Sequence, residues 1–67
     1  MSKTTLERLV YMANQIATNL ATTPNPAAET AAHIARYWDP RMKMMIRAAP
    51  RDGLSPVAAA AIAQLSA

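Results

Sequence analysis

The sequence has no cysteine and no phenylalanine, and it contains only 1 histidine and 1 glycine in 67 residues. Without cysteine, the chain can form neither a disulfide nor a thiolate zinc site. A single histidine also excludes most metal sites that are built from imidazole ligands. The length allows one domain at most, residues 1–67, and it excludes a Rossmann unit, a barrel or a large catalytic pocket.

Negative charge is scarce, because 4 acidic residues stand against 7 lysines and arginines, giving a formal net charge of +3. This mild basicity permits nucleic-acid binding but does not require it. The longest nearly uninterrupted apolar run, residues 57–63, is far shorter than the ~20 residues that span a bilayer. No signal-peptide pattern opens the chain, so we expect a cytoplasmic protein with no membrane contact.

The residues that are present favour an all-α protein. Alanine is abundant, and no segment alternates apolar and polar side chains as a half-buried strand does. Between residues 5 and 21 the apolar side chains follow helical spacing, and Thr4 and Glu7 have the spacing of a capping box. The predicted inward stripe of this helix consists of Leu6, Leu9, Val10, Ala13, Ile16, Ala17 and Leu20.

Three later helices are predicted from one repeated device, a capping side chain followed by proline. The pairs are Asn25-Pro26, Asp39-Pro40 and Ser55-Pro56. Proline loses no hydrogen bond at the first helical position, and it holds the preceding residue in the extended conformation of an N-cap. We therefore expect helices over residues 26–38, 40–49 and 56–65, with a turn at 50–53. The predicted fold is a small helical bundle of one long and three short helices.

Helical spacing also assigns the inward faces of the middle helices. The expected core residues are Ala27, Ala31, Ile34, Ala35 and Trp38, then Met42, Met45, Ile46 and Ala49. Trp38 is the largest of them and the expected anchor of the core. Residues expected to serve the fold rather than a partner are Thr4, Asn25, Trp38, Asp39, Pro40 and Ser55.

Several apolar side chains fall outside these faces. Tyr11 lies almost opposite the stripe of the first helix, near Gln15, and Met44 lies opposite Met42 and Met45. The helix at residues 56–65 is apolar nearly all round, which is typical of a helix that is buried on more than one side. Because we expect so small a bundle to cover only one side, this helix is predicted to offer a partner surface. The competing interpretation is that alanine is simply a strong helix former.

No constellation of residues points to catalysis. His33 lies one helical turn after Glu29, a spacing that commonly serves only helix stability. The serines stand at helix starts or chain ends, so we expect no catalytic, metal-binding or cofactor-binding residues. The basic residues between positions 36 and 51 could contact phosphate, but few aromatic side chains lie among them to stack on bases. A protein partner is therefore favoured over nucleic acid.

Three segments carry a family resemblance. Residues 12–17 read MANQIA, residues 33–42 read HIARYWDPRM, and residues 53–56 read GLSP before an alanine-rich helix. In this order they resemble the delta subunit of the cytoplasmic NAD-dependent formate dehydrogenases that contain molybdenum or tungsten. The resemblance covers almost the whole chain, although the turn at 50–53 is tighter and the last helix richer in alanine than in many relatives.

The resemblance implies a non-catalytic accessory subunit that assists assembly or stability of the complex that oxidises formate to carbon dioxide. It implies that the alpha subunit, the expected partner, holds the bis-pterin metal cofactor and iron–sulfur clusters. The beta and gamma subunits would carry FMN, further clusters and the NAD site. This chain would carry no cofactor of its own.

The candidate partner interface combines exposed apolar side chains with arginines. Methionine adapts to irregular surfaces, and arginine makes planar paired contacts with carboxylates. The candidates are Tyr11, Met12, Gln15, Arg36, Arg41, Met42 and Met44. Asn14 lies at the edge of the inward stripe, where it is expected to cap a neighbouring loop instead. Two alternatives stay open, a basic helical nucleic-acid-binding module and a self-assembling helical homodimer.

Overall fold

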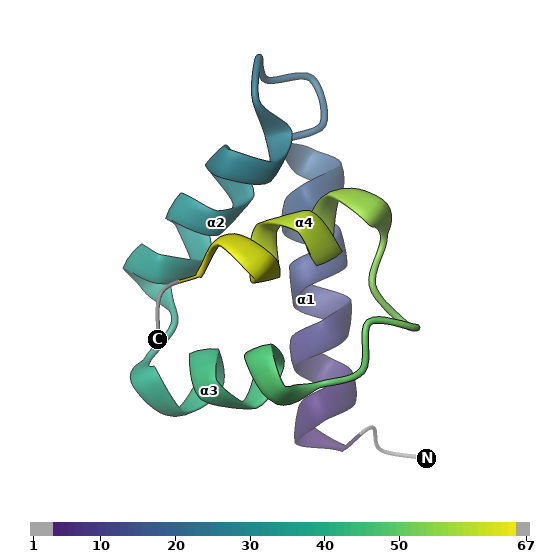
Figure 1. Ribbon diagram of the computed structural model, residues 1–67, viewed down its shortest axis with the longest axis vertical. Helices are drawn as coiled ribbons and strands as arrows, with labels where there is room; N and C mark the ends of the chain where they lie inside the picture. The colour runs from purple at the N-terminus through teal and green to yellow at the C-terminus, as the bar shows by residue number, and fades with distance from the viewer. Residues whose placement is uncertain (1–3, 66–67) are drawn as a thin grey trace.

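Each of the four α-helices begins directly after a predicted N-cap residue. The computed structural model describes residues 4–65. Its helices are α1 (Thr5–Asn19), α2 (Pro26–Tyr37), α3 (Pro40–Ala48) and α4 (Pro56–Gln64), as Figure 1 shows. No strand occurs between residues 4 and 65. The all-α class and the order of one long and three short helices are confirmed.

Each N-cap binds the backbone as the sequence predicts. The Glu7 N–H donates to Thr4 Oγ1 at 3.2 Å while the Thr4 N–H donates to Glu7 Oε1 at 3.3 Å, which completes the capping box. The side chains of Asn25, Asp39 and Ser55 accept from the N–H three residues later, at 3.3, 2.8 and 3.2 Å. These bonds satisfy N–H groups that have no partner within the helix.

Each helix ends one or two residues earlier than predicted. The first ends at Asn19 rather than at residue 21. The C-caps Trp38, Ala49 and Leu65 are extended, with ψ of 141°, 150° and 131°. For Ala49 the cause is the following proline, whose ring disfavours helical angles in the residue before it. The sequence pattern counted these capping residues as helical.

The turn at residues 50–53 is confirmed, and it approaches α1 closely. The Leu54 N–H donates to the Arg51 carbonyl at 3.1 Å. A Cβ atom placed on Gly53 would lie 3.3 Å from Val10 Cγ1, which is tight. The φ angle of Gly53 is not positive, so limited space rather than backbone conformation favours glycine here.

The apolar helix α4 packs against all three other helices. Figure 1 shows it running across the bundle from in front of α1 toward α2, with α3 below. Ala58, Ala61 and Ile62 are buried on it. Its exposed residues are Pro56, Ala60, Ala63 and Gln64. Ala58, Ala61 and Ile62 fall on one side of the helix and the exposed residues on the opposite side, so the bundle covers one side of α4, as expected. The exposed side carries no large apolar side chain.

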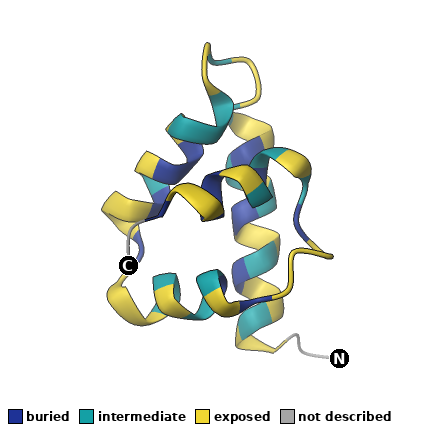
Figure 2. Cartoon of the chain, viewed as in Figure 1, coloured by how far each residue is buried: buried dark blue, intermediate teal, exposed yellow. Residues whose placement is uncertain are grey.

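The centre of the core is built from isoleucines. Ile34, Ile46 and Ile62, one each from α2, α3 and α4, are among the largest side chains that are fully buried. Helix α1 adds Leu9, Ala13 and Ala17, and the buried positions face the middle of the bundle in Figure 2. Trp38 joins this core at 5% exposure, as predicted.

One inward assignment on α2 is wrong. Ala35 is exposed, and Thr30 is buried in the stripe with Ala31 and Ile34. Thr30 lies one turn before Ile34 on the face that packs inward, whereas Ala35 lies about 100° around the helix from Ile34. Thr30 Oγ1 is buried and makes no hydrogen bond. Because threonine is polar, the pattern of apolar residues did not include this core position.

Candidate docking surfaces

Within the described residues, four large apolar side chains are exposed. Tyr11 is 52% exposed, Met12 39%, Tyr37 68% and Met44 64%. They lie on α1, α2 and α3, and none lies on α4. Single exposed apolar residues are ordinary on protein surfaces, so the groups around each one decide whether it belongs to a docking surface.

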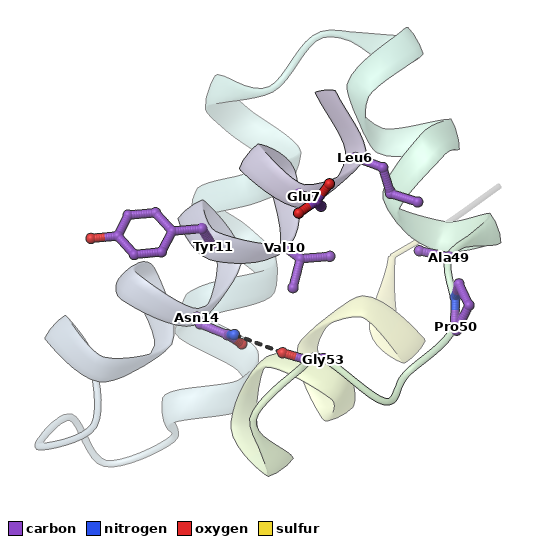
Figure 3. Close-up of a pocket in the computed structure, with 8 residues that line it drawn as sticks. All are labelled: Leu6, Glu7, Val10, Tyr11, Asn14, Ala49, Pro50 and Gly53. Atoms are coloured by element: carbon purple, nitrogen blue, oxygen red, sulfur yellow. Dashed lines mark hydrogen bonds between the residues drawn. The ribbon is translucent and has the colours of Figure 1, made fainter. Parts of the chain in front are cut away.

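The α1 candidates Tyr11 and Gln15 form a connected pair. Gln15 Nε2 donates to the Tyr11 hydroxyl at 2.8 Å across one helical turn. Both residues are exposed, and the Tyr11 ring extends away from Ala49 and Pro50 in Figure 3. The hydrogen bond joins the two exposed side chains, so this part of α1 presents an aromatic ring beside an amide. The third α1 candidate, Met12, follows Tyr11 on a different side of the helix.

An open groove of about 420 Å³ lies between α1 and the chain at residues 49–53. Its walls are mainly apolar, as Figure 3 shows. The lining residues are Leu6, Glu7, Val10, Tyr11, Asn14, Ala49, Pro50 and Gly53. Its acidic residue, Glu7, already accepts hydrogen bonds from Thr4. The groove is therefore suited mainly to apolar contact.

Asn14 closes one end of this groove. Its Nδ2 donates to the Gly53 carbonyl at 2.8 Å, and its Oδ1 accepts from the Ser55 N–H at 2.8 Å. The dashed line in Figure 3 marks the bond to Gly53. The prediction that Asn14 caps a neighbouring loop is confirmed, and we call these two bonds the Asn14 clamp.

The α3 candidates divide between the core and the surface. Met42 is half-buried and packs against the core with Met45, so its side chain contributes to the bundle. Met44 points outward, and Arg41 is exposed three residues before it. Helical spacing puts Arg41 and Met44 on neighbouring lines of the same face.

The α2 candidate Arg36 borders a second hollow, of about 250 Å³. Its lining residues are Leu20, Glu29, Ala32, His33, Arg36 and Tyr37. The rings of His33 and Tyr37 lie 4.7 Å apart between centroids at 44°, and Glu29 lines the same hollow. Tyr37 is the most exposed large apolar residue, and the sequence analysis did not select it. Its position four residues after His33 was the available signal.

The candidate residues therefore lie on three helices and not on one segment. The structure joins Tyr11 with Gln15 by a hydrogen bond and places Arg41 with Met44 on α3. Among residues 4–65, no group of three or more histidine, cysteine, aspartate or glutamate side chains could hold a metal ion. No helix in that same range is long and apolar enough to cross a membrane.

Comparison with known families gives one match. The family model described as NADH-dependent formate dehydrogenase delta subunit matches residues 8–62. No curated protein and no solved structure matches the chain. The matched range runs from the first turns of α1 into α4 and so includes all four helices.

Proposed function

Since this chain belongs to the family of NADH-dependent formate dehydrogenase delta subunits, we propose that it is a non-catalytic accessory subunit of such a complex. The observation that carries the proposal is the extent of the family match, 55 positions from 8 to 62. A match of this extent relates the whole bundle to the family rather than one helix or one motif.

We propose that the chain acts by docking onto the large subunits in the cytoplasm, with the alpha subunit as the main partner. The exposed Tyr11, Tyr37 and Met44 side chains support this role, because aromatic residues and methionine are enriched in protein interfaces. A bound helical bundle would stabilise the partner by binding only its folded form. Its contribution to the enzyme is then assembly or stability, not a step of formate oxidation.

The cofactors of the complex belong, in this proposal, to the other subunits. Iron–sulfur clusters are held mainly by cysteine thiolates, and this chain has no cysteine. Its larger groove is open and mainly apolar, which does not suit a charged bis-pterin, flavin or nicotinamide group. The bis-pterin molybdenum or tungsten cofactor, FMN and the NAD site would therefore lie outside this chain.

The decisive experiment is purification of the complex from cells that express or lack this chain. A tag on the chain should recover the alpha, beta and gamma subunits with formate-dependent NAD reduction. In enzyme from cells without the chain, each complex that remains intact should still oxidise formate at the same rate. It should also dissociate or lose activity faster on dilution and warming.

Three other results would contradict this proposal. If the tagged chain elutes without any formate dehydrogenase subunit, it is not a subunit of that enzyme. If the complex purified without the chain is equally stable and equally abundant, the proposed assembly or stability role is wrong. If an intact complex formed without the chain shows no formate oxidation until the chain is restored, its role is catalytic.

A further inference from the structure

The segment from residue 41 to residue 51 carries four cations and no anion. These are Arg41, Lys43, Arg47 and Arg51. The acidic residues that flank the segment are Asp39, whose Oδ1 accepts from the Met42 N–H at 2.8 Å, and Asp52. Helix α3 is therefore the most strongly charged part of the described bundle.

Two of these cations bind carbonyl groups of their own chain. Lys43 Nζ donates to the Ala35 carbonyl at 3.2 Å, in the last turn of α2. Arg51 Nη1 donates to the Ala49 carbonyl at 2.8 Å and to the Arg47 carbonyl at 3.3 Å, at the end of α3. Such carbonyls lack partners within their helices, so Lys43 and Arg51 serve the fold.

The other two cations have no such role. Neither the Arg41 nor the Arg47 side chain makes a hydrogen bond or an ion pair with any described residue. They lie three residues before and three residues after Met44, which is 64% exposed. Three residues turn an α-helix by roughly 300°, which is about 60° short of a full turn. Met44 therefore lies between the two arginines around the helix. Arg41 is exposed and Arg47 is half-buried. We call Arg41, Met44 and Arg47 the α3 outer face.

Resting on the function proposed above, we propose that the α3 outer face docks onto an acidic surface of the formate dehydrogenase complex. The partner surface would place carboxylates opposite Arg41 and Arg47, on either side of an apolar recess that receives Met44. Charge complementarity supports this occupant, because arginine forks match carboxylates and both guanidinium groups lack partners within the described chain.

A protein partner fits this face better than nucleic acid does. Single-stranded nucleic acid favours aromatic stacking platforms among basic residues, whereas the side chain between the two arginines here is a methionine. Methionine is flexible and polarisable, and it adapts to irregular apolar recesses on proteins. The arrangement of two cations around one apolar side chain therefore favours a surface with both carboxylates and apolar atoms.

The test uses the full chain and the formate dehydrogenase complex purified from cells that lack it. Two double variants are compared with the unchanged chain: Arg41→Glu with Arg47→Glu, and Arg41→Gln with Arg47→Gln. Arg8→Glu is the control for one charge reversal away from α3, and it is compared with the single variants Arg41→Glu and Arg47→Glu. Arg8 is an exposed arginine on α1 that makes no described hydrogen bond or ion pair. Melting curves of the isolated chains identify any variant that is unfolded.

We expect the glutamate variant to bind the complex at least about 100-fold more weakly than the unchanged chain. The glutamine variant should bind with an intermediate affinity and should lose most of the dependence of affinity on salt concentration. The Arg8→Glu control should bind within about threefold of the unchanged chain, as expected for a charge outside the contact. This pattern supports the α3 outer face as the docking surface.

The failures of the two proposals are distinguishable. If the unchanged chain binds and the folded glutamate variant binds equally well, this surface assignment is wrong while the accessory function stands. If the unchanged chain does not bind the purified complex, the function itself fails. If the same two substitutions instead abolish a homodimer or binding to a nucleic-acid probe and leave the complex intact, the α3 outer face has a different occupant and the proposal is overturned.

Discussion

Helices α3 and α4 have the same length, 9 residues, and both begin with a capping residue followed by proline, yet they have opposite roles in the bundle. Helix α4 is almost entirely apolar and lies between three neighbours. Helix α3 is rich in charge and leaves Arg41 and Met44 exposed. The comparison teaches that the apolar content of a helix does not tell how much large apolar surface it leaves exposed. The largely apolar α4 exposes only proline, alanine and glutamine, whereas the charged α3 exposes Met44.

The largest expected effect tests this difference by equivalent truncations in the two helices. Ile62→Ala on α4 should lower the free energy of unfolding by about 3 kcal/mol, because it leaves a cavity in a packed core. Met44→Ala on α3 should change it by less than about 0.5 kcal/mol, since Met44 is largely exposed. Urea unfolding followed by circular dichroism measures both. Equal losses would show that α3 is packed as tightly as α4.

The next effect concerns the connection between the two helices. Asn14→Ala should lower the free energy of unfolding by about 2 kcal/mol, because it leaves the Gly53 carbonyl and the Ser55 N–H without their partner. Gln15→Ala is the control, since that neighbouring amide bonds only the exposed Tyr11. The control should lose less than about 0.5 kcal/mol. Equal melting temperatures for the two variants would show that the Asn14 clamp does not stabilise the fold.

A smaller loss is expected at the N-cap of α3. Asp39→Ala should lower the free energy of unfolding by about 1 kcal/mol, because the Met42 N–H loses its acceptor. Asp39→Asn keeps an acceptor and should retain most of the stability. Binding to formate dehydrogenase should persist in both variants at temperatures where they are folded. Equal melting temperatures for Asp39→Ala and the unchanged chain would contradict the capping role.

The smallest effect has the opposite sign. Thr30→Val should raise the free energy of unfolding by about 0.5 kcal/mol, because it replaces a buried hydroxyl that has no partner by a methyl group of similar shape. Thr18→Val is the matched control, since the Thr18 hydroxyl is exposed and donates to the Asn14 carbonyl at 2.9 Å. Differential scanning calorimetry can compare the two. Destabilisation by Thr30→Val would mean that the hydroxyl has an acceptor in solution.

Local features of the sequence predicted the starts of the helices well. The pairs Asp39-Pro40 and Ser55-Pro56 combine a side-chain acceptor with a restricted backbone, so each signal lies within two adjacent residues. Helix ends lack such a pair. Only at Ala49, which precedes a proline, did the sequence contain the reason for the end. At Trp38 and Leu65 the helix ends without a local signal that we recognised.

Features that depend on packing partners were harder to predict. Thr30 is buried because the inward stripe of α2 passes through it, although its residue type favours the surface. One side of α4 is buried by contacts with three helices, and helical periodicity cannot show which side, because nearly all of its residues are apolar. Asn14 is different, because a polar side chain at the edge of an inward stripe already suggested a contact with another segment. For Tyr37 the available signal was its position four residues after His33, whose ring it contacts.

The Asn14 clamp also has a consequence for the lifetime of the folded chain. Its two hydrogen bonds join residues that are separated by 39 and 41 positions in the sequence, whereas each N-cap bond joins residues that are 3 positions apart. Contacts between such distant residues require closure of a long loop, so we expect the clamp to form after the transition state for folding. Weakening a late contact speeds unfolding more than it slows folding. We therefore expect Asn14→Ala to change the lifetime of a folded copy more than the rate at which one forms.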